Sequence, residues 1–496
     1  MVDLRAKPYC LSGWDAAWVK AVIASMSDEE KAGQLLFCGN AAGGGTPQEL
    51  VEQYHIGGCH CAGLPSRQVR EFNRALQTAA DIPLFLACGT QSGGSGAATD
   101  GTYIANGWKI AATGRPQYAR ELGFLANEEA AAMGNNMAFA PLCALHPGGG
   151  STESAQQAAE LGAAYVAGVH DLPGFASVCR CCLDDGDGTA VWEGVYRALI
   201  DAGVDGVMVA GDGCGRDPDW APDGLLRGGL GYRGVVICDT APMTGGARGE
   251  LMAAAINGGY DMLLCSGGVE EDFQRVLAAC RDGAISEARL SDALTRILGL
   301  KARMGLHRRA RTALVPSAAA LTAILGAPKY KAAAEMISRD ALTLVRCGTP
   351  ELLPLRPEKY RRIVLADVSG PDDTVPWDNS PAELLCQRLR DKGFDAAAAR
   401  IPGEGGGEPD QGRDLVLLMS GAERFELGGE EAWLVPGVPA IGISGGAPAA
   451  PSDAPALDAL INIYDAQPLT LDVLVEKLLT GPEAFRGSCY AGSRDY

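Results

Sequence analysis

The sequence predicts an α/β protein that begins with an eight-stranded β/α barrel and ends with a smaller α/β unit. Three observations support this fold class. The chain has 496 residues, which exceeds what one ordinary hydrophobic core covers and favours two domains. Its first part alternates short apolar runs with longer segments that carry apolar residues at helical spacing. Its 66 glycines are typical of a fold with many tight turns between strands and helices.

Eight short apolar runs in the first part of the chain predict the strands of the barrel. They span residues 34–39, 57–63, 83–88, 138–142, 175–180, 205–211, 234–239 and 261–265. Runs that are apolar on both faces are typical of parallel strands covered by helices, and eight such strands close most simply into a barrel. A capping box from Ser27 to Glu30 marks the start of an early helix. The helical pattern over 286–306 closes the unit, so we assign residues 1–310 to the barrel.

The remaining sequence predicts a second, smaller domain. Residues 311–329 are expected to form a linker, and residues 330–496 again alternate helical patterns with apolar runs such as RRIVLADVSG, DLVLLMSG and PAIGISGG. This alternation predicts an α/β domain with an open sheet. No G-x-G-x-x-G follows a strand there and no Walker A lysine is present, so we expect no nucleotide cofactor and no other cofactor.

The formal charge of −19 limits the partners of the protein. This charge repels nucleic-acid phosphates and anionic lipids, and no stripe of Lys or Arg offsets it. No stretch approaches the roughly 18 uncharged apolar residues that span a bilayer, and the first residues lack the apolar core of a signal peptide. We therefore expect a cytoplasmic protein that binds neither nucleic acid nor membranes.

Sixteen cysteines are a high number, and many of them lie inside the apolar runs. In a chain without a secretory signal, such cysteines are typical of reduced thiols that pack as small hydrophobic side chains. The cluster CRCC at 179–182 has the alternative interpretation of a soft-metal or redox site, but no second C-x-x-C pair accompanies it. We expect no metal at these cysteines.

Asp239 ends the seventh predicted strand, in the segment GYRGVVICDTAPM. Catalytic groups of β/α barrels lie at the carboxyl ends of the strands, where the loops meet. An Asp at this position also caps a following helix or turn in many proteins. Position alone leaves both interpretations open.

Nine stretches in a fixed order along nearly the whole chain carry a family resemblance. They are MSDEEKAGQLLF, YHIGGCHCAG, FNRALQTAADIPLFLA, ATGRPQYARELG, FAPL, AGVDGVMVA, GYRGVVICDTAPM, AINGGYDMLLC and SRDALTLVRCGTPELLPL. Together they resemble glycoside hydrolase family 3, especially its β-N-acetylglucosaminidase branch. The resemblance implies a TIM-like (β/α)8 barrel followed by an α/β sandwich domain. It also implies retaining hydrolysis of O-glycosyl bonds in β-N-acetylglucosaminide-type carbohydrates or glycoconjugates, with Asp239 as the nucleophile.

The acid/base position departs from the family pattern. The branch motif K-H-F-P-G-H-G-D corresponds to RCCLDDGDG, with Arg180 in place of the Lys, Asp185 in place of the acid/base His, and Asp187 in place of the Asp that holds it. Crowded like charges disfavour simultaneous ionisation, so Asp185 is the candidate acid/base and Asp187 its dyad partner. Glu404 and Glu408 are alternative acids, because other branches of the family supply a Glu from outside the barrel.

The sugar-binding positions are also altered. The resemblance places Thr90, Gln91, Arg180 and Met243 among the substrate-binding residues, but Thr90 stands where the family has an Asp, and Ala144 replaces a second Asp. Each lost charge-assisted hydrogen bond is worth roughly 1.5–3 kcal/mol. Arg180 places a guanidinium where the family has a lysine ammonium, and a guanidinium pairs well with an acidic sugar or a peptide carboxylate.

Two functional hypotheses follow from this pattern. In the first, the protein is a glycosidase with Asp239 as nucleophile and Asp185 as acid/base. In the second, it is a catalytically impaired pseudoenzyme that uses the barrel cavity for binding or assembly. The segment LDDGDG itself has three interpretations: an acid/base site, a solvated acidic turn, or a calcium or magnesium site.

Overall fold

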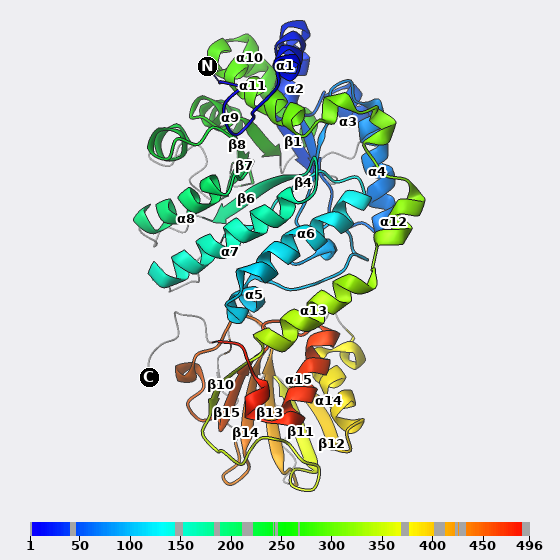
Figure 1. The fold of residues 1–496 in the computed structure, drawn as a ribbon, viewed down its shortest axis with the longest axis vertical. Coiled ribbons are helices and arrows are strands. Elements are labelled where there is room, and N and C mark those ends of the chain that lie inside the picture. Colours follow the sequence, from blue (N-terminus) through cyan, green and yellow to red (C-terminus); the bar gives the residue numbers. More distant parts are fainter. Residues whose placement is uncertain are drawn as a thin grey trace. The chain divides into compact units, whose positions relative to one another are not determined.

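The computed structural model describes residues 2–39, 46–143, 152–182, 189–210, 222–241, 243, 247–265, 268–368, 376–400, 412–421, 425 and 433–488. The chain divides into two compact units. The first contains residues 1–104 and 116–330, and the second contains residues 105–115 and 331–496. Figure 1 shows the elements of both units along the chain.

The first unit is a closed parallel barrel, as the sequence predicts. Its strands are β1 (Leu36–Gly39), β2 (Gly58–His60), β3 (Phe85–Cys88), β4 (Met137–Ala138), β5 (Leu142–Cys143), β6 (Ala176–Cys182), β7 (Gly206–Ala210), β8 (Val235–Asp239) and β9 (Met262–Cys265). The sheet order is β4-β3-β2-β1-β9-β8-β7-β6-β5, and a further pairing of β4 with β6 closes an eight-stranded ring. Each pairing in the ring is parallel.

The fourth predicted strand, 138–142, is the element in which the structure differs from the sequence-based expectation. Two short strands, β4 and β5, replace it, and both pair with β6. Pro141 lies between them. Proline has no N–H to donate to a ladder, so a continuous strand through this position is disfavoured.

The barrel unit is covered by helices on the outside. They are α1 (Gly13–Ser25), α2 (Asp28–Gln34), α3 (Pro47–Glu52), α4 (Ser66–Ala79), α6 (Pro116–Ala132), α7 (Thr152–His170), α8 (Thr189–Asp201), α9 (Arg248–Asn257), α10 (Val269–Arg281) and α11 (Glu287–Arg303), followed by α12 (Ala318–Ile324). Helix α13 (Pro328–Ala341) comes next, and its residues from 331 onward belong to the second unit. The predicted capping box is confirmed at α2, where Ser27 and Glu30 exchange side-chain-to-backbone hydrogen bonds. The segment expected to be a linker contains α12 and the start of α13.

Apolar residues fill both faces of the barrel wall. Phe37 and Phe139 contact each other with their ring centroids 5.1 Å apart, and both are buried. The neighbouring residue Cys38 pairs in register with Cys59 and Cys265. These three thiols are buried and free, which agrees with the expectation that the strand cysteines pack as small hydrophobic residues.

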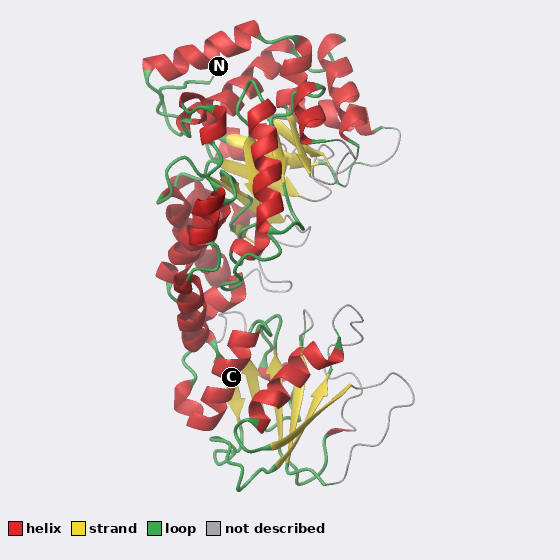
Figure 2. Cartoon of the chain, turned by 90° about the vertical axis from the view of Figure 1, so that its right-hand side faces the viewer, coloured by secondary structure: helices red, strands yellow, loops and turns green. Residues whose placement is uncertain are grey.

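The second unit contains a six-stranded mixed sheet in the order β10-β15-β14-β13-β11-β12. Its elements are β10 (Thr343–Cys347), β11 (Arg362–Asp367), α14 (Pro381–Arg390), β12 (Asp395–Arg400), β13 (Leu415–Ser420), β14 (Ala440–Ser444), β15 (Ala459–Asn462) and α15 (Pro468–Thr480). Strand β10 runs antiparallel to β15, and the other pairings are parallel. Helices α14 and α15 pack on one face of this sheet, and Figure 2 shows helices lying across its strands.

Residues 105–115 belong to the second unit although they lie between β3 and α6 of the barrel in the sequence. They form α5 (Gly107–Thr113), whose Ala112 packs with Ala341 and Tyr464. The fully buried Lys109 makes an ion pair with Asp465, with a nitrogen-to-oxygen distance of 2.6 Å. This segment therefore takes part in the core of the C-terminal unit.

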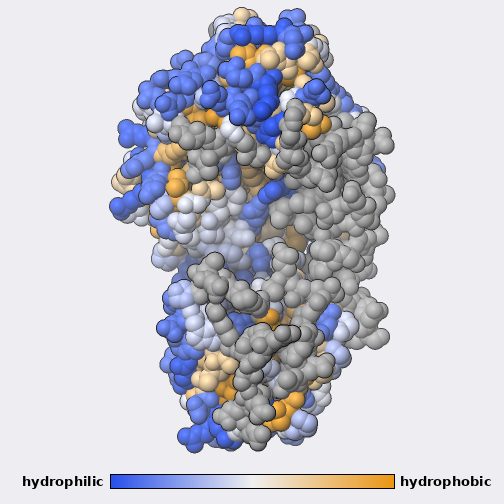
Figure 3. Space-filling model, turned by 180° about the vertical axis from the view of Figure 1, so that it is seen from behind, coloured by the Kyte–Doolittle hydropathy of each residue, from blue (hydrophilic) through white to orange (hydrophobic). Residues whose placement is uncertain are grey.

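None of the described helices combines the length and the apolar character that a membrane-spanning segment needs. On the face drawn in Figure 3, the described residues are mostly hydrophilic, and the apolar ones form small separate patches.

Candidate active site

The register of the barrel places Asp239 and His60 on the same face of the sheet. Residues paired between neighbouring parallel strands point to the same side, and residues two apart in one strand do so as well. Asp239 pairs with Leu264, which pairs with Phe37. Phe37 in turn pairs with Gly58, two residues before His60. The aromatic rings of Phe37 and His60 both contact Phe139, which follows β4. Strands β1 and β4 are not neighbours in the barrel, so side chains from them can meet across it. This face is therefore the barrel interior.

Arg180 is on the same inner face, at the carboxyl end of β6. It pairs with Met208, which pairs with Ile237, two residues before Asp239. The Arg180 Nη2 atom lies 3.8 Å from Asp239 Oδ2. The Arg180 side chain is 41% exposed and that of Asp239 is 15% exposed, so both remain open to a small molecule. The strand ends of β6 and β8 thus bring a cation and a carboxylate together in the mouth of the barrel.

The backbone after β8 holds the Asp239 carboxylate. Its Oδ1 atom accepts a hydrogen bond from Ala241 N at 3.0 Å, the geometry of a short turn that an Asp side chain stabilises. The next residue, Thr240, is buried and donates its hydroxyl to Leu264 O at 2.8 Å. Turn capping and exposure in the barrel mouth therefore coexist at Asp239, and the two interpretations of this residue do not exclude each other.

Arg248, at the start of α9, braces the same turn and was not singled out by the sequence analysis. It donates to Thr240 O and Thr240 Oγ1, each at 3.0 Å, and to the carbonyl of Met243. Its charge is balanced by the buried Asp272, at 2.8 and 2.7 Å. No local pattern announces this role, because Arg248 and Asp272 meet only when α9 and α10 pack.

His60 is a second residue that the sequence analysis did not assign to the site. Its ring stacks on Phe139 with 5.3 Å between centroids and an interplanar angle of 17°. Burial and then the charge of Arg180 lower the pKa of His60 below its usual value of 6.5, so the ring is neutral near pH 7. The sequence shows a polar residue within an apolar strand, but the inward direction of His60 follows only from the register between β1 and β2.

Thr90 and Gln91 follow β3, and the structure engages both in protein contacts. Thr90 is fully buried; its hydroxyl donates to Asn127 Oδ1 at 2.8 Å and accepts from Tyr165 OH at 3.1 Å. Gln91 Nε2 donates to Phe139 O at 2.9 Å. Met243, after β8, is buried in the barrel core. These contacts fix the loops around the mouth.

The predicted acid/base segment is not among the described residues. Asp185 and Asp187 lie in 183–188, and the alternatives Glu404 and Glu408 lie in 401–411. The three interpretations of LDDGDG therefore stand as they were derived from the sequence.

Within the described ranges, no group of three or more His, Cys, Asp or Glu side chains is arranged to hold a metal ion. The buried thiols are also poor ligands and nucleophiles in their protonated form. Burial raises the pKa of the Cys61 thiol to about 11.

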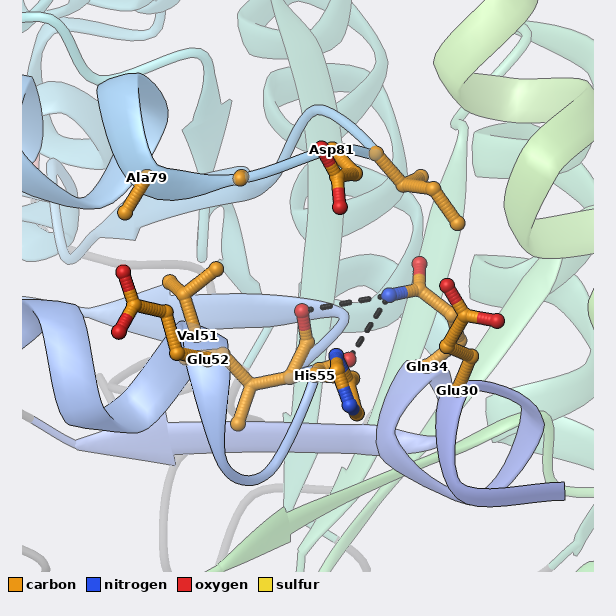
Figure 4. A pocket seen from close by; sticks show the side chains of 10 residues that line it. Glu30, Gln34, Val51, Glu52, His55, Ala79 and Asp81 are labelled. Carbon is orange, nitrogen blue, oxygen red and sulfur yellow. Dashed lines mark hydrogen bonds between the residues drawn. The ribbon is translucent and has the colours of Figure 1, made fainter. Parts of the chain in front are cut away.

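A separate cavity of about 180 Å³ lies at the opposite end of the barrel. Its lining includes Gln34, Ile56 and Ile82, which lie two or three residues before the first residues of β1, β2 and β3. Figure 4 shows Gln34 donating from its amide to the carbonyls of the loop at residues 55 and 56. In β/α barrels the amino ends of the strands serve stability, whereas catalytic groups occupy the carboxyl ends. We therefore place the candidate active site at Asp239 and not at this cavity.

Comparisons with known proteins show the family and the fold of the chain. The family model described as "Glycosyl hydrolase family 3 N terminal domain" matches residues 28–191 and 189–300, more than half of the chain. A Cellulomonas fimi protein named "Beta-N-acetylglucosaminidase/beta-glucosidase" is 29% identical over 98% of this chain and 98% of its own length. A solved structure named "Beta-glucoside phosphorylase BglX bound to 2FGlc" is 25% identical, with a TM-score of 0.83 and 98% of both chains covered. A glycoside hydrolase family 3 β-N-acetylglucosaminidase from Paenibacillus sp. strain FPU-7 shares the fold at 21% identity, with a TM-score of 0.72 over 94% of this chain and 98% of that one.

Proposed function

Because this chain belongs to glycoside hydrolase family 3, we propose that it cleaves β-linked glycosides by a retaining mechanism with Asp239 as the nucleophile. The observation that carries the proposal is the position of Asp239 at the carboxyl end of β8, on the inner face of the barrel and partly exposed. Attack on an anomeric carbon needs an ionised carboxylate. The Arg180 guanidinium and the Ala241 N–H both interact favourably with a negative charge at this place.

The mechanism that we propose has two steps with one covalent intermediate. Asp239 attacks the anomeric carbon, the glycosidic bond breaks, and the departing oxygen takes a proton from the acid/base residue. Asp185, supported by Asp187, is our candidate for that residue, with Glu404 and Glu408 as alternatives. In the second step the same residue, now deprotonated, takes a proton from a water molecule, the water oxygen bonds to the anomeric carbon, and the bond to Asp239 breaks with its electron pair returning to the carboxylate. Retaining enzymes hold the two carboxyl groups about 5–5.5 Å apart, which is the geometry expected for the true partner of Asp239.

The proposed substrates are β-N-acetylglucosaminides and β-glucosides. A curated relative is named for both activities. Thr90 supports a weaker hold on sugar hydroxyls than the family's usual Asp provides, because its hydroxyl is already bonded to Asn127 and Tyr165. We therefore expect a high KM for simple aryl glycosides, with binding energy coming from other parts of the site.

The test of this proposal is a covalent trap. The full-length protein is incubated with aryl β-glucosides and β-N-acetylglucosaminides, and with a 2-fluoro glucosyl fluoride or a 5-fluoro N-acetylglucosaminyl fluoride. We expect turnover of at least one aryl glycoside, a mass increase on the peptide that contains Asp239, and a loss of roughly 10³-fold or more in kcat for Asp239→Asn. Asp201→Asn, at the exposed end of α8, is the matched control and should behave like the parent. Absence of turnover and of label across a broad sugar panel would favour the pseudoenzyme hypothesis instead.

A second candidate function differs in the acceptor. In this alternative the glycosyl group passes to inorganic phosphate, and the product is a glycosyl phosphate. The observation that favours it is Arg180, a half-exposed cation beside the nucleophile in a protein whose formal charge is −19. A relative of known structure is named a β-glucoside phosphorylase. The two functions are separated by product analysis in the presence and absence of phosphate.

A further inference from the structure

The register of the strands sorts the inward residues of the barrel into layers. Followed around the ring, the pairings return to β8 eight residues before the residue from which they start, which is the usual stagger of a β/α barrel. Residues at equal height are therefore displaced by one position per strand from residues that are paired. Alternate strands contribute to one layer, and the strands between them contribute to the next.

Two of these layers lie at the mouth of the barrel. The upper layer consists of Gly39 at the end of β1, Gly89 after β3, Arg180 on β6 and Asp239 on β8. The lower layer consists of His60 on β2, Phe139 after β4, Met208 on β7 and Leu264 on β9. The contacts agree with this arrangement, because Arg180 Nη2 lies 3.8 Å from Asp239 Oδ2 and the rings of His60 and Phe139 stack. His60 is the one polar side chain of the lower layer.

The two glycines of the upper layer open one side of the mouth. Gly39 and Gly89 lie on the strands that flank β2, and they place no side chain above the lower layer. Beneath that opening, His60 and Leu264 are partly exposed. The other two residues of the lower layer are buried, because β6 lies between their strands and carries the long Arg180 side chain. The accessible floor of the mouth therefore consists of Leu264 and His60.

A sugar whose first carbon is bonded to Asp239 is expected to lie across this floor. Strand β9, which carries Leu264, is next to β8 in the ring, and β2, which carries His60, is two strands farther. The apolar face of a pyranose ring packs well on a leucine side chain, whereas its hydroxyls need polar partners. The ring carbon opposite the anomeric carbon is C4. Its hydroxyl therefore lies at the His60 end of the floor.

His60 and Gln91 present polar atoms to that end of the floor. Stacking on Phe139 fixes the plane of the His60 ring, and no described residue hydrogen-bonds to its nitrogens. The ring is neutral near pH 7, because burial and the charge of Arg180 lower its pKa, so it offers one N–H donor and one acceptor to a hydroxyl. Gln91 donates its Nε2 to Phe139 O, and its Oε1 atom lies 3.3 Å from the place that a Cβ on Gly89 would occupy. This amide oxygen is therefore a second acceptor on the open side of the mouth.

We propose that His60 recognises the C4 hydroxyl of the sugar and thereby determines substrate specificity, with Gln91 Oε1 as a second acceptor for the same hydroxyl. This inference rests on the proposed function, because it places the first carbon of the sugar at Asp239. It also accounts for a polar side chain in an otherwise apolar layer. A partly buried imidazole without a partner is costly, and the bound sugar supplies the partner.

The experiment pairs one residue with one hydroxyl. For the full-length protein, kcat/KM is measured with an aryl β-glycoside that it cleaves and with the 4-deoxy form of the same glycoside. We expect the parent to prefer the hydroxylated glycoside by about tenfold or more, because the 4-deoxy form leaves the imidazole unpaired. In His60→Phe, which keeps a ring against Phe139, this preference should fall at least about fivefold.

Two further variants separate recognition from a structural role. Leu264→Met is the matched control, because it changes the apolar part of the same floor. It should keep the parental preference, whatever its effect on kcat. His60→Gln keeps an N–H donor and should recover part of the preference that His60→Phe loses. A merely structural role of His60 would lower kcat/KM equally for both glycosides and leave the preference unchanged, which would overturn the inference.

The outcomes for the proposed function and for this inference are distinguishable. Absence of turnover and of label on Asp239 overturns the proposed function and this inference with it. Label on Asp239 with the same preference in the parent and in His60→Phe overturns only the inference. Where a variant shows no turnover, the preference is measured by calorimetry as the ratio of dissociation constants for 1-deoxynojirimycin, a glucose-shaped iminosugar, and its 4-deoxy form, with the same expected differences between variants.

Discussion

Lys109 lies in α5 with its side chain fully buried, and we predict that Lys109→Met lowers the free energy of unfolding of the C-terminal unit by about 3–4 kcal/mol. Its ammonium contacts Asp465 Oδ2 at 2.6 Å, Thr470 Oγ1 at 2.7 Å and Ser338 Oγ at 3.2 Å. These three oxygens match the three donors of an ammonium group. The variant removes the donors and leaves the Asp465 carboxylate without its cation.

The magnitude follows from what remains around Asp465. Methionine fills much of the volume of the lysine side chain, so a cavity contributes little, and the cost comes from a carboxylate that is only 9% exposed. Breaking a buried pair by removing one partner costs about 3–5 kcal/mol. At Asp465, the Thr470 hydroxyl at 2.6 Å and the Gln467 N–H at 3.2 Å still donate, which favours the lower half of that range.

Asp465→Asn tests the same pair from the other side. Burial already lowers the pKa of Lys109, and removal of Asp465 takes away the main group that opposes this shift. In that variant the unfolded chain binds a proton at Lys109 that the folded chain does not hold. Stability then rises with pH between the folded and unfolded pKa values. We expect Asp465→Asn to be less destabilised at pH 9 than at pH 7, whereas Lys109→Met shows no such recovery.

The assay is urea unfolding of the full chain, with hydrogen exchange of residues 105–115 to locate the effect. Lys331→Met, at an exposed position of the same unit, is the matched control and should stay within about 0.5 kcal/mol of the parent. The reasoning is refuted if Lys109→Met differs from this control by less than about 1 kcal/mol, or if Asp465→Asn shows no dependence on pH.

Three further predictions concern the barrel unit. The hydrogen bond from Arg308 lowers the pKa of Asp15 to about 2, so Asp15→Asn should lower the free energy of unfolding by about 2 kcal/mol at pH 7. The ionised carboxylate loses this stabilisation as the pH falls toward 2. Urea unfolding at pH 3 should therefore show about half of the difference between variant and parent. A Cβ on Gly96 would lie 1.6 Å from Gly89 O, because two backbone segments after β3 approach each other closely there. Gly96→Ala should therefore lower the thermal midpoint by an amount that corresponds to about 1–3 kcal/mol. An unchanged midpoint would contradict this close approach. Arg248→Gln should lower kcat by roughly 10–100-fold with a much smaller change in KM, and partial recovery in Arg248→Lys would separate positioning of the nucleophile from a structural defect.

The barrel was predictable because its signals are local. The eight apolar runs correspond to the strands of the closed ring, and the capping box at α2 is formed by residues only three apart. The position of Asp239 at the end of a barrel strand was predictable for the same reason, whereas its role as nucleophile stays a prediction. The interruption of the fourth strand also has a local cause, Pro141. The sequence does not reveal, however, that short strands pair with β6 both before and after this proline.

The features that the sequence did not reveal depend on contacts between distant segments. The packing of α5 in the C-terminal unit rests on Lys109 and Asp465, which are separated by more than 350 positions. Neither residue is unusual in its own surroundings, and a buried lysine is uncommon enough that an exposed one is the better expectation. The inward direction of His60 depends on the register between β1 and β2, and a shift of one residue would turn it to the helices.

Because the protein as a whole is acidic, binding of an anion depends on local cations such as Arg180. With a formal charge of −19, the average field around the chain repels anions, so an anionic acceptor gains nothing from the surface as a whole. At physiological salt, however, exposed charges are screened over about 8 Å, and inside a partly desolvated mouth a cation at contact distance is screened much less. Binding of phosphate then depends on Arg180, on the state of Asp239, 3.8 Å away, and on the proposed acid/base pair Asp185 and Asp187, more than on distant charges of the chain. The same reasoning predicts that salt weakens this binding less than it weakens an anion held by surface lysines, because the pairing that decides it is short and partly buried.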